Sequence, residues 1–261
     1  MVHIIIFSAV AGICGMGFGG LVSAMLLKRP SENMVCWLLS FAAGVMVSIV
    51  CFGLIPEAFK LAGMAVSVSG LIFGVFIIRV LNYLVDKITI TRKENLRIHS
   101  THEELYHESQ LIHNPAKILR SGIIILLAIS LHNIPEGIAI GAGGSYNFNL
   151  GAVLALMIAV HNVPEGMAIA APLLAGGVNK WKVVFLTSLS GATTLLGGLV
   201  GILLGSISSF AVAISLSAAG GAMLYVVFGE IMPQSIIMTK NRTASMVTLC
   251  GMIVGLIVAQ I

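Results

Sequence analysis

The sequence predicts an all-α integral membrane protein, and three observations lead to that class. Of the 261 residues, 58% are hydrophobic and only 9% are charged, and the mean hydropathy is +1.05. Soluble domains carry about 25% charged residues, so the composition excludes a soluble enzyme, a nucleic-acid-binding protein and a disordered chain. The apolar residues also form runs of the length that a helix needs to cross a bilayer, about 20 residues. We therefore expect one transmembrane domain, residues 1–261, whose surroundings are the lipid bilayer and no nucleic acid.

Eight apolar runs, each bounded by charged or turn residues, account for the chain in order. They cover residues 3–27, 34–58, 62–85, 119–145, 149–174, 182–206, 211–235 and 244–261. No Lys or Arg precedes the first run, which is also too long for the apolar part of a signal peptide, so we expect it to stay as a span. Cysteines lie in or beside these runs without a Cys-x-x-Cys pair, which favours neither disulfides nor a thiolate metal site. These are Cys14, Cys36, Cys51 and Cys250.

The distribution of basic residues predicts the orientation of these spans. Of the 14 Lys and Arg residues, all except Lys60 fall on one side of an eight-helix path. Basic loops face the cytoplasm, so both termini are expected outside the cytoplasm, in a multi-pass protein of the cell (plasma or inner) membrane. An odd number of spans would place the basic residues on both sides of the membrane. The segment 86–118 then forms a cytoplasmic loop between the third and fourth spans.

An internal repeat is the most informative feature of the sequence. The segment Leu131–Ile140 recurs 29 residues later as Val160–Ile169, and both copies contain His-Asn-x-Pro-Glu-Gly. One helix and a tight turn separate the copies, so they run in opposite directions. A weaker match of Ala-Ala-Gly, Phe-Gly and Pro relates residues 42–56 to 218–233. Antiparallel internal copies are typical of transporters with inverted repeats, whose substrate site lies near the midplane.

The repeated motif places acidic and imidazole groups inside the membrane. His132 and Glu136 are four residues apart and share one helix face, as do His161 and Glu165. A carboxylate at the bilayer centre costs at least about 2.5–3.5 kcal/mol, and no Lys or Arg lies at matching depth. One such pair is more often a structural polar contact, but two copies on neighbouring helices favour a bound divalent cation.

Other polar or soft side chains extend the possible ligand set. Asn133 and Asn162 lie on the flanks of the two motif faces. With them, the site offers nitrogen and oxygen donors that suit Zn²⁺, Fe²⁺, Mn²⁺, Co²⁺ or Cd²⁺ and disfavour Cu⁺. Met46 in the second run either adds a sulfur ligand or fills the core. Glu57 and Glu230, near the ends of the second and seventh runs, either gate the site or anchor the helices at the interface.

The eight spans, the duplicated motif and the long loop between the third and fourth spans resemble the Zrt/Irt-like protein (ZIP) family of divalent-metal transporters. The likeness covers essentially the whole chain and is greatest to the bacterial zinc-uptake branch. It implies a 3+2+3 helix arrangement, import of zinc into the cytoplasm, a second metal site at Asn133 and Asn162, and a homodimer. The primary metal site that it implies consists of His132, Glu136, His161, Glu165 and Met46.

Two regions depart from the family pattern or leave alternatives open. Many relatives carry a glutamate in the sixth helix, where this chain has Thr194; a hydroxyl cannot replace that charge, so the centre holds either one metal or a weak second one. In the loop, histidines either bind and sense metal, as the resemblance implies, or belong to a plain polar linker. These histidines are His99, His102, His107 and His113.

The leading hypothesis is therefore a divalent-metal transporter, with zinc as its cargo, no cofactor and no enzymatic activity. A membrane metalloenzyme is the runner-up, but the zinc-protease motif His-Glu-x-x-His is absent from the sequence. Each nearby carboxylate is also needed as a ligand, which leaves no general base. A metal sensor without transport is the third hypothesis. The donor set does not rank zinc against iron, manganese, cobalt or cadmium.

Overall fold

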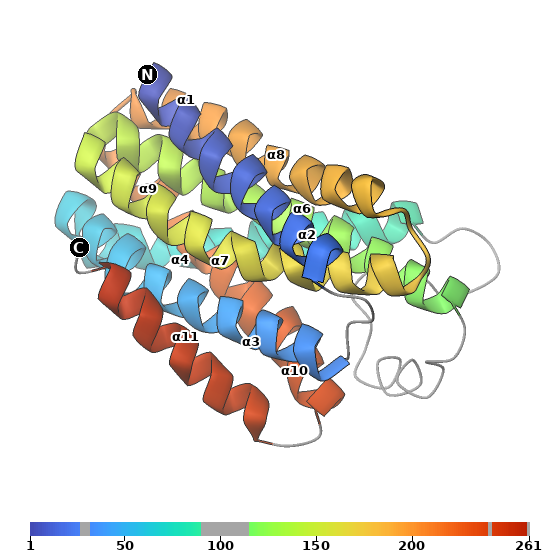
Figure 1. Ribbon diagram of the computed structural model, residues 1–261. Helices are drawn as coiled ribbons and strands as arrows, with labels where there is room; N and C mark the ends of the chain where they lie inside the picture. Colours follow the sequence, from blue (N-terminus) through green and yellow to red (C-terminus); the bar gives the residue numbers. More distant parts are fainter. Residues whose placement is uncertain (27–31, 90–114, 240–241, 260–261) are drawn as a thin grey trace.

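The computed structural model describes residues 1–26, 32–89, 115–239 and 242–259, and all regular structure in these ranges is helical (Figure 1). The all-α class predicted from the sequence is therefore confirmed. Of the segment 86–118, predicted as a loop, the described parts are helical, because α4 extends to Thr89 and α6 begins at Pro115. The loop histidines at 99, 102, 107 and 113 lie outside the described residues.

The helices follow the predicted runs to within a few residues. In the first half they are α1 (Val2–Ala9), η1 (Val10–Cys14), α2 (Gly15–Leu26), α3 (Glu32–Ser48), η2 (Ile49–Leu54) and α4 (Ile55–Thr89). In the second half they are α6 (Pro115–Tyr146), α7 (Phe148–Ala175), α8 (Lys180–Gly205), α9 (Ser209–Val226), η3 (Val227–Ile231), α10 (Met232–Thr239) and α11 (Thr243–Ala259). The three η segments are short π-helical turns within longer rods, a feature often found at functional sites.

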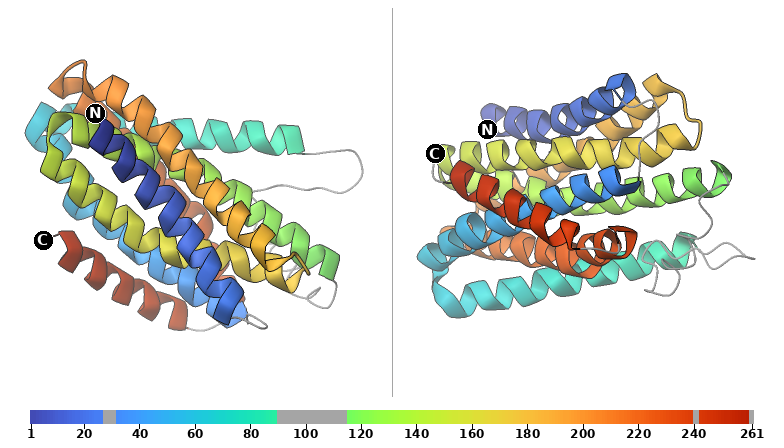
Figure 2. Two further views of the ribbon diagram at one scale, coloured as in Figure 1. Left: turned by 45° about the horizontal axis from the view of Figure 1, so that its top comes forward. Right: turned by 60° about the horizontal axis from the view of Figure 1, so that its bottom comes forward.

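Six helical segments among the described residues are long and apolar enough to cross a membrane. The longest, Cys36–Leu81, has 46 residues and would extend about 69 Å as one rod, twice the thickness of a bilayer core. Gly63 interrupts it with φ 76° and ψ 172°, a conformation that residues with a Cβ avoid. Figure 2 shows the chain turning back at this end of α4. Thr243–Ile257 is a shorter apolar helix, and the count of eight spans stays a prediction.

A one-residue connection joins the two helices that carry the repeated motif. Asn147 separates α6 from α7, and its Oδ1 accepts hydrogen bonds from the backbone N–H groups of Asn149 and Leu150 at 2.8 and 3.3 Å. This cap satisfies donors at the start of α7 that have no partner within the helix. His132 and His161 lie 14 and 13 residues from the ends of the helices at this turn, so both lie at a depth of about 20 Å.

The helices form two groups, and within each group glycines allow the helix backbones to pack closely. We define the first group as α1, η1, α2, α6, α7 and α8, and the second as α3, η2, α4, α9, η3, α10 and α11. In the first group, the backbones of Gly12 and Gly191 touch where η1 crosses α8. In the second, Gly44 meets α11 and Gly74 meets the Ala218 backbone of α9. Gly12 and Gly191 thus allow two helices to approach closely, as small residues do in a membrane.

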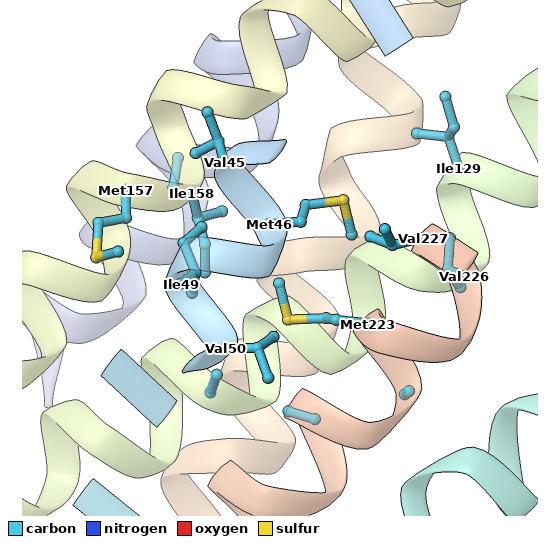
Figure 3. Packing of buried hydrophobic residues seen from close by; sticks show 14 of the residues in the cluster. Val45, Met46, Ile49, Val50, Ile129, Met157, Ile158, Met223, Val226 and Val227 are labelled. Atoms are coloured by element: carbon cyan, nitrogen blue, oxygen red, sulfur yellow. The ribbon is translucent and has the colours of Figure 1, made fainter. Parts of the chain in front are cut away.

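A layer of larger apolar side chains separates the two groups. It lies where α3 and η2 contact α7, and where α9 contacts α6. Figure 3 shows this layer from close by. Its members are buried and include Val45, Met46, Ile49, Val50, Ile129, Met157, Ile158, Met223, Val226 and Val227. The contact between groups is therefore made by apolar Val, Ile and Met side chains, whereas contacts within each group bring backbones together.

The π-helical turns η2 and η3 occupy matching places in the weaker sequence repeat. Phe52-Gly53 lies in η2, and its counterpart Phe228-Gly229 lies in η3. A π turn requires one extra residue in the helix and rarely forms without a local cause. Its recurrence at the same dipeptide supports the relationship between the second and seventh predicted spans.

Candidate metal centre

The four His and Glu residues of the repeated motif meet at the contact between α6 and α7. His132 is 1% exposed, and Glu136, His161 and Glu165 are fully buried. Both helices continue through their motif prolines, Pro135 and Pro164. The prediction that the two copies lie side by side within the membrane domain is therefore supported by the fold.

Each histidine pairs with the glutamate of the other helix. His161 Nε2 lies 2.9 Å from Glu136 Oε1, and His132 Nε2 lies 3.5 Å from Glu165 Oε2. Because α6 and α7 are antiparallel, one step along α6 corresponds to one step back along α7, which produces the two crossed pairs. The two pairs link α6 to α7 and bring both carboxylates close together.

Ligand atoms of His132, Glu136 and Glu165 all lie within 4.8 Å of one another, close enough to share one metal ion. His161 adjoins this cluster through Glu136. Its Nδ1 lies 3.2 Å from the carbonyl oxygen of Met157, which can only accept, so Nδ1 carries the proton. His161 Nε2 lies 2.9 Å from Glu136 Oε1 and donates to it only when the ring carries protons on both nitrogens. A bound metal ion would take the place of the Nε2 proton, and a ring fixed by a backbone carbonyl is typical of metal-binding histidines.

The carboxylates keep free oxygen atoms for a cation. Glu136 Oε2 and both oxygens of Glu165 accept no hydrogen bond from the described residues. Two buried carboxylates whose described side-chain partners are two imidazoles are costly unless a cation offsets their charge. Lys60 pairs with Glu57 instead, at 3.1 Å near the exposed start of α4. The arrangement suits a divalent ion that is bound by nitrogen and oxygen.

Backbone carbonyls hold the two motif asparagines. Asn133 Nδ2 donates to the carbonyl oxygen of Ser190 in α8 at 3.2 Å, and Asn162 Nδ2 donates to that of Ala11 in η1 at 2.9 Å. Both side chains are fully buried, and their Oδ1 atoms have no hydrogen-bond partner among the described residues. Sequence reasoning missed these anchors because a backbone carbonyl has no signature in the sequence.

The remaining candidates lie in different surroundings. Met46 is fully buried in the apolar layer between the two groups, with Met223 and Val227 nearby (Figure 3), and its role as a ligand stays a prediction. Glu57 forms the exposed ion pair with Lys60, an environment consistent with anchoring at the interface. Glu230 belongs to η3, and its side chain is not among those that the structure describes.

Comparison with known proteins gives one consistent result. Residues 85–260 match the family model described as ZIP zinc transporter. The chain is 36% identical over 237 residues to a zinc transporter ZupT of Escherichia fergusonii, covering 90% of this chain and 88% of that protein. It is 37% identical over 242 residues to a zinc transporter ZupT of Salmonella paratyphi A, covering 92% and 90%. The similarity therefore extends over nearly the whole of both chains.

Proposed function

The chain belongs to the ZIP zinc transporter family, a family of multi-span membrane transporters and not of enzymes, and from this premise we propose that it carries zinc into the cytoplasm. The ion is the cargo, and it binds during transport to His132, Glu136, His161 and Glu165 between α6 and α7. Asn133, Asn162 and Met46 are further proposed ligands. Fe²⁺, Mn²⁺, Co²⁺ and Cd²⁺ are alternative cargoes, because they accept the same donors.

The crossed pairing of the two His–Glu pairs is the observation that supports this function best. It gathers two negative charges and two imidazoles in a fully buried place. A divalent ion bound there exchanges its hydration shell for these ligands, and its charge balances both carboxylates. Because the bound ion and the two carboxylates together carry no net charge, the ion can be held in the membrane interior at a low electrostatic cost.

The proposed topology has eight crossings in a 3+2+3 arrangement of inverted repeats. The Cys36–Leu81 segment contributes two crossings through its turn at Gly63, and Thr243–Ile257 contributes the last. The matched π turns in η2 and η3 support the inverted relationship. The one-sided distribution of basic residues places both termini outside the cytoplasm. By family resemblance, two copies of the single domain 1–261 form a homodimer.

Access to the site alternates when one group of helices moves against the other. Backbone contacts at glycines hold each group together, whereas Val, Ile and Met side chains separate the groups. Such an apolar layer can repack as the groups slide, because apolar contacts are not directional and its Met side chains are flexible. The four motif residues all belong to the first group and travel with it.

Zinc uptake into proteoliposomes tests the proposal. We expect the purified protein to accumulate zinc down an imposed gradient and the double variant Glu136→Gln/Glu165→Gln to accumulate none above empty liposomes. The matched control is Glu32→Gln/Glu94→Gln, two glutamates outside the predicted spans, which should transport like the wild type. Wild-type rates in the Glu136/Glu165 variant would refute the function, and zinc binding without any uptake would indicate a sensor.

A further inference from the structure

Two glycines in the second group of helices are not explained by close packing. They are Gly53 in η2 and Gly229 in η3, where the nearest atoms to an added Cβ lie at 3.8 and 3.7 Å, ordinary van der Waals distances. At each other described glycine of that group with helical backbone angles, a Cβ would approach a neighbouring atom to 3.1 Å or closer. Glycine destabilises a helix relative to alanine, because its backbone has more freedom. Gly53 and Gly229 therefore contribute backbone freedom rather than room for a neighbouring helix.

The helix hydrogen bonding is also weakened at both places. Within each π turn, a backbone N–H group bonds to the carbonyl oxygen five residues back instead of four. These bonds join Ile55 to Val50 and Met232 to Val227. A proline follows each glycine and cannot donate to the carbonyl oxygen four residues before it; these prolines are Pro56 and Pro233. Both helices are therefore easier to bend here than elsewhere along their length.

The helices of the second group pack as two halves. We define the α3 half as α3, α10 and α11, which contact one another, and the α4 half as α4 and α9. Glycines bring backbones together within each half, since Gly44 of α3 meets α11 and Gly74 of α4 meets α9. Larger apolar side chains lie between the halves, including Met46 of α3 and Met223 of α9 (Figure 3). Each half is thus held together more closely than it is held to the other.

The chain passes from one half to the other at the two π turns. η2 leads from α3 to α4, and η3 leads from α9 to α10. The sequence repeat relates the two crossings, and each contains a glycine that has room for a Cβ. The third π turn, η1, differs, because its Gly12 touches the Gly191 backbone of α8.

We propose that Gly53 and Gly229 are paired hinges, about which the α3 half and the α4 half turn relative to each other during transport. The inference rests on the proposed function, since it concerns access to the metal centre of a zinc transporter. The α3 half contacts α7, and the α4 half contacts α6 through α9. The metal centre lies where α6 meets α7, so turning the halves apart opens the second group over the centre. Turning them back covers the centre again.

Distances between spin labels test the motion without a transport assay. In a chain without its native cysteines, Ile72→Cys in α4 and Leu249→Cys in α11 place labels on exposed positions of the two halves. In nanodiscs, we expect two populations of distances whose ratio changes with zinc, and one population in the variant Gly53→Ala/Gly229→Ala. The control pair, Trp37→Cys with Leu249→Cys, lies within the α3 half and should give one distance throughout. A single Ile72–Leu249 distance in the chain with both glycines, unchanged by zinc, would overturn the inference.

Zinc uptake and zinc binding by the same variant give a second test. We expect Gly53→Ala/Gly229→Ala to bind zinc like the wild type but to transport it about 10-fold more slowly, because alanine at both sites favours a straight helix. The matched control is Ser69→Ala/Ser245→Ala, which places alanine at one exposed position in each half, outside the π turns. This control should transport zinc like the wild type.

The outcomes separate this inference from the proposed function. Uptake at the wild-type rate in a folded Gly53→Ala/Gly229→Ala variant would overturn the hinges and leave the transport proposal standing. Loss of zinc binding in that variant would also overturn them, because the two glycines would then shape the centre itself. A wild-type chain that takes up no zinc would overturn the transport proposal, whereas the label distances would still decide whether the halves turn.

Discussion

His161 Nε2 lies 2.9 Å from Glu136 Oε1, so the histidine of one motif copy meets the glutamate of the other. The companion pair, His132 and Glu165, repeats the relationship at 3.5 Å. Each copy of the motif therefore supplies half of both pairs. Neither copy can form the site without its neighbour, which gives a physical reason for the duplication.

This reciprocity predicts that the two glutamates are equally necessary. We expect Glu136→Gln and Glu165→Gln each to weaken zinc binding by at least about 10–100-fold, the loss typical of disturbing even the partners of metal ligands. Isothermal titration of the purified variants measures the effect. If one variant bound zinc like the wild type while the other lost binding, the two copies would not share one ion.

The anchored amide of Asn162 leads to a separate prediction. Asn162→Ala removes both the proposed ligand oxygen and the hydrogen bond to the Ala11 carbonyl, so we expect zinc affinity to fall about 10-fold or more. Asn149→Ala is the matched control, because Asn149 is an exposed residue at the start of α7. Unchanged affinity in Asn162→Ala would remove this side chain from the centre.

The contact between Gly12 and Gly191 predicts a steric effect on stability. A Cβ on Gly12 would lie 2.6 Å from the Thr194 Cβ as well as against the Gly191 backbone. We expect Gly12→Ala to lower the free energy of unfolding by about 1–3 kcal/mol, as overpacking does, and to lower the melting temperature in detergent.

Gly229→Ala serves as the control for that measurement. The nearest atoms to a Cβ on Gly229 belong to Tyr225, at 3.7 Å, which is ordinary van der Waals contact. Its melting temperature should match that of the wild type. Equal melting temperatures for the Gly12 and Gly229 variants would show that the backbone contact does not hold the first group together.

The proposed orientation predicts which loops are reached from outside the cell. In a chain without its native cysteines, Ser206→Cys at the end of α8 should react with a membrane-impermeant maleimide on intact cells. Asn179→Cys, at the other end of α8 beside Lys180, should react only after the membrane is opened. The opposite pattern would invert the topology and, with it, the direction assigned to transport.

The sequence predicts the helices and the position of the two motif copies on neighbouring antiparallel helices, because each has a strong local signal. Apolar runs mark the spans, and the 29-residue period brings His132 and His161 to one depth once Asn147 makes a tight turn. These features depend on residues close in sequence, so the sequence alone is sufficient.

The crossed pairing and the polar anchors could not be predicted in this way. Spacing placed His132 with Glu136 on one helix face, but the pairing with Glu165 depends on the register between two helices, which a one-residue change in the turn would alter. The carbonyls of Ala11 and Ser190 act through the backbone and have no sequence signal. The π turn in η2 likewise has no sign in the sequence.

Anomalous diffraction at the zinc edge, from crystals grown with zinc, shows where in the membrane domain the ion binds. We expect one strong peak among His132, Glu136, His161 and Glu165, with ligand distances of about 2.0–2.2 Å. A map in which these four side chains keep their mutual contacts while zinc lies elsewhere, or binds nowhere in the membrane domain, would contradict it.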